Sequence, residues 1–266
     1  MKKFIKILAM FAMASCVFAS CEKTAGDAEN EGNGNNDGGI IDDGGSSVQL
    51  PAALTGSDYY VFFLGESEYK AIEKKVSANL MPNSSNVFVD VWQAGETYMG
   101  AETVGLNSFG FGEGWLAFAV NTGTTWSGGA ISTRPSEDGT VALPAADLSK
   151  IMANPSEWYF HFALKSDVAG ESHVIDLYWG DQENGGSHYP VVAGANPGDF
   201  TDGVTTYPVP VSGEYKVGEW NEYEIPISQT GLNFNLPIAA GNLVAFLSGG
   251  TAGKTLNLDA VFIYKK

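Results

Sequence analysis

The feature that most constrains the fold of this chain is a series of short aromatic and β-branched runs, separated by clusters of glycine, asparagine and proline. Runs of this kind predict β-strands joined by turns. Helical periodicity is visible only at 67–75 and 145–154, and Pro155 would end the second stretch. The sequence therefore predicts an all-β fold, a two-sheet antiparallel β-sandwich of the jelly-roll type with one or two short helices. We expect its strands at 59–64, 87–92, 108–111, 115–121, 158–165, 174–179, 223–227, 243–248 and 256–264.

The first 20 residues have the pattern of a bacterial secretory signal. Three lysines precede an apolar stretch at 7–17, which is too short to span a bilayer. The sequence FASC at 18–21 resembles a lipobox, in which the cysteine becomes the lipidated amino terminus. Cys16 is a second candidate, and a plain signal peptide with incidental cysteines is the alternative. We therefore expect a signal peptide at 1–20 and a lipid on Cys21.

Residues 21–48 are expected to form a tether. The stretch behind Cys21 is rich in glycine, asparagine and acidic residues and has almost nothing to bury, which is typical of a disordered linker. An acidic tract in this place resembles the export signal of surface lipoproteins in the Bacteroidota; the alternative is a spacer that faces the periplasm. The resemblance implies a protein on the outer membrane, at the cell surface, with the lipid as its only membrane contact. No shift of composition divides residues 49–266, so we expect one domain there.

The charge of the chain limits its partners. Lys and Arg number 14 against 31 Asp and Glu, and Arg134 is the only arginine. Nucleic-acid surfaces need clustered cations, so we expect no nucleic acid as a partner. Aromatic residues are abundant while charged residues are sparse. This combination favours a neutral polar ligand with apolar faces.

Side-chain alternation separates a buried face from an outward face on the best-defined strands. Along 158–165, Trp158, Phe160, Phe162 and Leu164 share the core face, which leaves His161 on the opposite one. The strands at 87–92 and 174–179 show the same alternation between a core face and an outward face. If the three strands belong to one sheet, its outer face is a shelf of aromatic rings and carboxylates, made of Asp90, Trp92, Tyr159, His161, Asp176 and Tyr178.

Four stretches of the chain, at 92–132, 158–167, 217–228 and 253–266, resemble galactose-binding-like jelly-roll domains of Bacteroidota glycan-utilisation lipoproteins, the carbohydrate-binding-module class. The resemblance implies that a polysaccharide or oligosaccharide binds to the sheet face or to the loop edge, and that the protein works with outer-membrane transporter components. It also implies a possible structural calcium near Asp259. No dense acidic cluster accompanies Asp259, which could equally be a surface residue, and no other cofactor is expected.

The expected ligand-binding residues follow from the chemistry of sugars. A pyranose has an apolar C–H face that stacks on an aromatic ring, and hydroxyls that bond to polar side chains. The sheet-face candidates are the shelf residues, whereas the loop-edge candidates are Trp126 and Arg134. Each has a structural alternative: Trp126 could cover the core, and Arg134 could pair with a nearby acid. The full set is Trp92, Trp126, Arg134, Tyr159, His161, Asp176 and Tyr178.

Two other classes of function compete with binding. A β-sandwich glycosidase needs two carboxylates that flank the scissile bond, and Glu222 and Glu224 offer suitable spacing on one strand. However, the strand is short and Pro226 follows at once, and no other catalytic motif is present. A structural subunit of a pilus or adhesin is the second alternative. Such subunits usually mature by cleavage after a basic residue, and the tether offers none after Lys23. We therefore expect a non-catalytic binding protein.

We predict that Cys21 carries the lipid. Cells that express the Cys21→Ala variant and grow on a fatty-acid analogue should show no label on the protein, because its thiol is the acceptor. The Cys16→Ala variant is the matched control and should keep the label. Full labelling of Cys21→Ala would contradict the assignment, and labelling lost only in Cys16→Ala would move it to the earlier cysteine.

Overall fold

The computed structural model describes residues 40–41, 47–48, 50–83, 85–92, 97–99, 105–120, 126–167, 172–194, 215–249, 253 and 255–266. All of them belong to one compact unit, Gly38–Lys266. The predicted signal peptide and the lipidation site lie outside the described residues. Within the predicted tether, β1 (Ile40–Ile41) pairs with β2 (Ser47–Val48) in a short antiparallel ladder. Among the described residues there is no helix long and apolar enough to cross a membrane.

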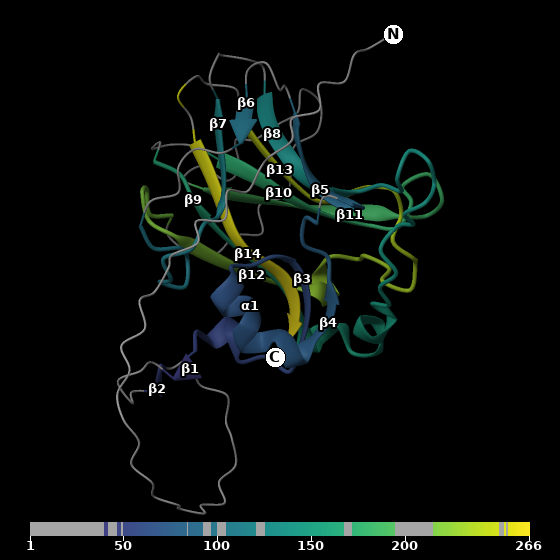
Figure 1. Cartoon of the computed structure of the whole chain (residues 1–266), viewed down its shortest axis with the longest axis horizontal. Helices are drawn as coiled ribbons and strands as arrows, with labels where there is room; N and C mark the ends of the chain where they lie inside the picture. Colours follow the sequence, from purple (N-terminus) through teal and green to yellow (C-terminus); the bar gives the residue numbers. More distant parts are fainter. Residues whose placement is uncertain are drawn as a thin grey trace, which may run out of the picture. The chain divides into compact units, whose positions relative to one another are not determined.

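Two β-sheets face each other and confirm the predicted sandwich (Figure 1). One sheet has five antiparallel strands, in the order β11 (Ser187–Gly194), β10 (Ser172–Trp179), β13 (Gly241–Gly249), β8 (Trp126–Thr133) and β5 (Val87–Trp92). The other has seven strands. Its main path is β12 (Asn221–Pro226), β9 (Trp158–Lys165), β14 (Thr255–Lys265), β3 (Asp58–Phe63) and β4 (Val76–Asn79), and β7 (Leu116–Val120) lies between β14 and β6 (Thr97–Met99).

Helical structure is sparse, as predicted. The stretch at 67–75 forms α1 (Glu66–Ile72) and continues as a 3-10 turn, η2 (Glu73–Lys75). The stretch at 145–154 gives only a 3-10 turn, η3 (Ser149–Ala153), and a second one, η4 (Pro155–Glu157), follows immediately. The other 3-10 turns of the described residues are η1 (Ala52–Leu54) and η5 (Ile227–Gln229).

The core between the sheets comes from the alternation along the strands. The predicted core residues of β9 are all buried there, and Ile175, Leu177 and Trp179 of β10 face them from the five-stranded sheet. Rings of β7 and β13 also meet across the core, with Phe118 and Phe246 centroids 4.6 Å apart. Burying a large apolar side chain of this kind contributes about 1.5–3 kcal/mol.

The strand prediction missed the short strands β4 and β6 and was wrong in three further places. Residues 108–111 form a turn, because the side-chain oxygen of Asn107 accepts the backbone N–H groups of Phe109 and Phe111. The sequence of β8, WSGGAIST, looked like a loop, but a Cβ at Gly129 would overlap the carbonyl oxygen of Asp90 on the neighbouring strand. The strand β11 was not among the expected strands. It contains Pro190, which an edge strand tolerates.

The predicted shelf was also wrong, because its strands do not share a sheet. The strand β9 pairs with β12 and β14, whereas β5 and β10 belong to the five-stranded sheet. The side of β9 that carries His161 is covered by a second apolar cluster. This cluster contains Leu54 of η1, Ile72 of α1 and the rings of β3 and β14.

A pair of carboxyl groups fastens residues 105–113 to α1. Glu113 accepts the backbone N–H of Ser67 at 2.9 Å, and Glu68 accepts the side-chain amide of Asn107. Both carboxyl groups converge over Gly65, where a Cβ would overlap them. Burial, together with the neighbouring Glu113, raises the pKa of Glu68 to about 7. The pair therefore shares one proton below about pH 7.

We predict that Glu68 makes the fold less stable as the pH rises. The folded chain keeps Glu68 protonated to about pH 7, whereas the unfolded chain releases this proton near pH 4.5. The free energy of unfolding should therefore fall through this window, by at most about 1.4 kcal/mol per pH unit for one proton. The Glu68→Gln variant keeps the shape and the hydrogen-bonding capacity of the protonated carboxyl group, so it should lose this part of the fall. Urea unfolding at pH 5 and pH 7.5 in the presence of a chelator measures the difference.

The control is Glu66→Gln, which neutralises an exposed residue of the same helix that pairs with Lys70. Its pH dependence should stay close to that of the unmodified protein. Identical slopes in the unmodified protein and in Glu68→Gln would show that the shared proton does not exist.

Candidate functional site on the five-stranded sheet

A row of polar and aromatic side chains crosses all five strands on the face turned away from the core. Strand pairing aligns Phe88 with Ser132, Ser132 with Asn242, and Tyr178 with His188. A β-bulge between Asn242 and Val244 turns two successive apolar residues of β13 into the core and leaves Asn242 on the outer face. From β5 to β11 the outer row is Phe88, Ser132, Asn242, Tyr178 and His188.

At the β5 end of the row the single arginine lies on an aromatic ring. The guanidinium carbon of Arg134 is 3.8 Å from the ring centroid of Phe88, within cation–π range. Burial raises the pKa of Asp90, the next outward residue of β5. The charge of Arg134 and a hydrogen bond with Ser132 lower this pKa, but by less than burial raises it. The Ser132 hydroxyl also lies 3.0 Å from the side-chain oxygen of Asn242, so polar contacts run on to β13.

At the β11 end a histidine is oriented by a buried carboxylate. Nδ1 of His188 lies 2.8 Å from Oδ2 of Asp176, and its ring stacks on Tyr178 with centroids 5.0 Å apart. Burial raises the pKa of Asp176, and the bond from His188 opposes this rise. The His188 side chain is 43% exposed. Donation from Nδ1 leaves the Nε2 lone pair available as a hydrogen-bond acceptor.

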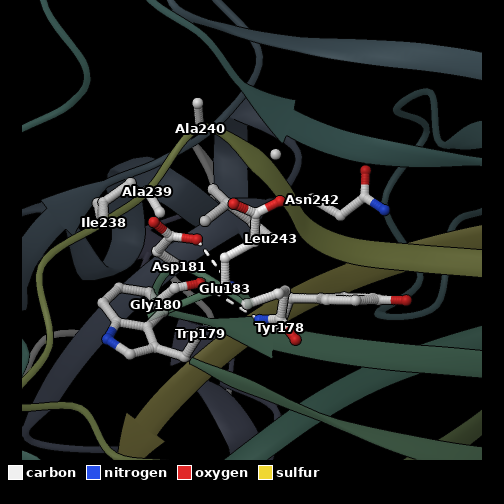
Figure 2. A pocket seen from close by; sticks show the side chains of 12 residues that line it. Tyr178, Trp179, Gly180, Asp181, Glu183, Ile238, Ala239, Ala240, Asn242 and Leu243 are labelled. Atoms are coloured by element: carbon white, nitrogen blue, oxygen red, sulfur yellow. Dashed lines mark hydrogen bonds between the residues drawn. The ribbon is translucent and has the colours of Figure 1, made fainter. Parts of the chain in front are cut away.

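A pocket of about 460 Å³ adjoins the row where Tyr178 and Asn242 meet. It lies between the turn after β10 and the segment that leads into β13, and it falls in the size range of small-molecule sites. Figure 2 shows Tyr178 and Asn242 on one side of the pocket and Asp181 near Ala239 on the other. The indole of Trp179, also in the lining, is held by a 2.9 Å bond from its Nε1 to the Leu236 carbonyl.

Two acidic side chains line this pocket. Asp181 accepts the side-chain amide of Asn184 at 2.5 Å and the backbone N–H of Glu183 at 2.9 Å, and these bonds hold the pKa of Asp181 below its usual value. Glu183 contributes the second carboxylate from an exposed position in the same turn. The pocket thus combines an aromatic wall with a negatively charged rim.

The structure divides the predicted ligand-binding residues between two sheets. Trp92, Asp176 and Tyr178 lie on the outer face of the five-stranded sheet, and Arg134 follows its strand β8. Trp126 begins β8, but its side chain lies outside the described residues. Tyr159 is on the seven-stranded sheet, where Lys266 Nζ lies 3.9 Å from its ring centroid.

The expectation that His161 lies on an open face was wrong. Its side chain is fully buried, with Nδ1 2.8 Å from the Ala260 carbonyl oxygen. The ring packs between Phe262, with centroids 4.7 Å apart, and Phe109, at 5.7 Å. The turn at 105–111 places Phe109 over this face. The sequence of β9 contains no pattern that predicts this contact.

Sequence reasoning missed four members of the row. Ser132 and Asn242 carry no recognisable motif, and His188 lies on β11, a strand that was not expected. Phe88 could have been found, because alternation along 87–92 already placed it beside Asp90 and Trp92 on the outward face.

The structure shows the hydrogen bonds of Asp259 and does not test the expected calcium. Its Oδ2 accepts the backbone N–H and the hydroxyl of Ser108, at 2.9 and 2.6 Å, while Oδ1 is buried without a hydrogen-bond partner. Calcium takes about six to eight oxygen ligands. No group of three or more His, Cys, Asp or Glu side chains that could hold a metal occurs in the described parts of the chain. Calcium near Asp259 therefore stays a prediction.

No protein-family model and no curated protein matches this sequence. Solved structures do share its fold in part. A family 30 carbohydrate-binding module has 16% sequence identity and a TM-score of 0.40, over 67% of this chain and 91% of the module. A family 11 module of a Clostridium thermocellum cellulosomal cellulase has 14% identity and a TM-score of 0.36, over 68% and 88%. These values describe a distant resemblance between β-sandwiches and carry no argument about function.

Proposed function

We propose that this protein is a non-catalytic binder of poly- or oligosaccharides that holds its ligand on the outer face of the five-stranded sheet. The observation that carries the proposal is the outer row with its adjoining pocket. The proposal includes attachment to the outer membrane through a lipid on Cys21, display at the cell surface and transfer of the captured glycan to outer-membrane transporter components. The amino-terminal sequence supports this second part.

The outer row has the chemistry that a sugar chain needs. Aromatic rings from β5 and β10 can cover apolar C–H faces, and the side chains of Asn242 and His188 can bond to hydroxyls, whereas Ser132 is buried and bonds to Asn242. Covering one sugar face is worth roughly 1–2 kcal/mol per ring. Several rings with a few hydrogen bonds that compete with water correspond to an affinity of about micromolar to millimolar.

The length of the row favours a chain of sugars over a single ring. Neighbouring strands in a sheet are about 4.8 Å apart, so four steps from β5 to β11 span roughly 19 Å. A ligand that follows the row would cross the strands and end near the pocket beside Tyr178. The extended row suits an oligosaccharide, and the pocket suits one unit of it.

The spacing of Asp90 and Asp176, the two carboxylates on the strands of this face, supports binding without hydrolysis. Glycosidases place two carboxyl groups about 5–9.5 Å apart. Asp90 and Asp176 share one cross-strand row but are separated by β8 and β13, which puts their strands roughly 14 Å apart. The two residues are therefore too widely spaced for an acid–base pair.

The sequence alternative, Glu222 and Glu224, lies on the other sheet. Burial alone would raise the pKa of Glu224. However, Lys266 at 2.5 Å and the Tyr264 hydroxyl both donate to this carboxylate and hold its pKa below the ordinary value. A general acid in a glycosidase needs a raised pKa. Glu224 is instead an ionised partner in a structural contact.

We predict that Tyr178→Ala and Asn242→Ala weaken glycan binding. A panel of plant, algal and host glycans, tested by affinity gel electrophoresis with the detergent-solubilised protein, should identify a ligand. Loss of the Tyr178 ring should lower the affinity for it about tenfold, because one stacked face is worth roughly 1–2 kcal/mol. Incubation with the same glycans should release no reducing ends.

The matched control is Tyr159→Ala, which removes the same side chain from the seven-stranded sheet. It should leave the affinity unchanged, and thermal unfolding should show that all variants remain folded. Binding that responds equally to Tyr159→Ala and Tyr178→Ala would refute this placement of the site. No retention on any glycan would refute the proposed function itself.

A further inference from the structure

The five-stranded sheet and its pocket are almost without positive charge. None of the five strands contains a lysine or an arginine. The only arginine of the chain, Arg134, lies over Phe88 of β5, which is separated from β10 by β8 and β13. The pocket lining includes Asp181 and Glu183 and no basic residue. This face therefore presents negative charge to a ligand, apart from one end.

Three lysines of the described residues are instead found in contacts of the other sheet. Lys150 pairs with Asp58, and Lys266 pairs with Glu224. Lys165 lies between two indoles, 5.3 Å from the ring centroid of Trp115 and 5.7 Å from that of Trp220. These three cations stand beside the seven-stranded sheet, and none of them lines the pocket.

We propose that Asp181 and Glu183 determine specificity, so that the pocket accepts a sugar unit without negative charge and rejects uronate or sulfated units. This inference rests on the proposed function and names its ligand class. The negative charge of Asp181 is secured by the bonds from Asn184 and from the backbone of Glu183. An anionic group in the pocket would meet two carboxylates with no cation to offset them. A sugar hydroxyl would instead donate a hydrogen bond to either carboxylate, and an ammonium group would be attracted.

The test compares two derivatives of the neutral glycan that binds best in the panel. The hydroxyethyl derivative adds an uncharged substituent, and the carboxymethyl derivative adds a negative one of similar size. At low salt the unmodified protein should bind the carboxymethyl form about tenfold more weakly, because two carboxylates repel each added charge. High salt should shrink this ratio, because it screens exposed charges.

Variants of Asp181 and Glu183 test whether these two residues cause the selection by charge. In the double variant, which combines Asp181→Asn with Glu183→Gln, the ratio of the affinities for the two derivatives should fall to about threefold or less at low salt. Glu183→Gln alone should give a partial effect without touching the bonds that order the turn, so a folding defect of the double variant would not obscure the result. Glu73→Gln, an exposed glutamate of η2 near the other sheet, is the matched control and should keep the tenfold ratio.

The outcomes separate the two proposals. Equal binding of both derivatives by the unmodified protein would overturn the charge selection while leaving glycan binding intact. A ratio that is unchanged in Glu183→Gln and in the double variant would also overturn it, because the repulsion would then come from elsewhere. Failure of every neutral glycan in the panel would remove the proposed function together with this inference.

Discussion

The strand β14 is the constraint on which the rest of the structure depends. It pairs with β9 along one edge and with β7 and β3 along the other, so it joins most of the seven-stranded sheet. Nine of its eleven residues are buried. Leu258 and Val261 belong to the core between the sheets, whereas Phe262 and Tyr264 belong to the cluster under η1 and α1. One strand thus supports two apolar layers on opposite faces.

A local irregularity makes this double role possible. The pairing register of β14 shifts between Asp259 and Phe262, and Ala260 has a φ of 52°. A left-handed conformation costs a non-glycine residue roughly 1–2 kcal/mol, and the burial of the neighbouring side chains offsets it. The shift resets the alternation, so that Val261 enters the core and Phe262 stacks on His161. The same bulge therefore places the Phe262 ring against His161 and contributes to the burial of that histidine.

Helical turns and the 105–113 segment cover the seven-stranded sheet, whereas the outer face of the five-stranded sheet has a buried centre around Asp176 and keeps Tyr178 and His188 partly exposed. On the seven-stranded sheet, this cover removes the outward face from contact with a ligand and uses the carboxyl groups of Glu68 and Glu113 to hold itself in place. On the five-stranded sheet, polar side chains lie on the outer face, and the bulge in β13 leaves Asn242 beside the pocket. None of the strands of this sheet contains a lysine, and Arg134 lies only at the β5 end, so ligand charge can act in the proposed selection at the pocket.

The sequence by itself determined the strands with strong alternation and their buried faces. The bounds of β5 and β9 agree with the expected ones, and Trp158 and Leu177 lie in the core as predicted. Alternation depends only on the backbone geometry of one strand, so it can be read locally. Only the tertiary structure decided which strands share a sheet. It separated His161 from Asp176, required glycine in β8 because Asp90 of β5 approaches it, and brought residues 178–183 and 238–243 together around the pocket. Each of these outcomes depends on contacts between segments far apart in the chain, and no periodicity within one strand contains that information.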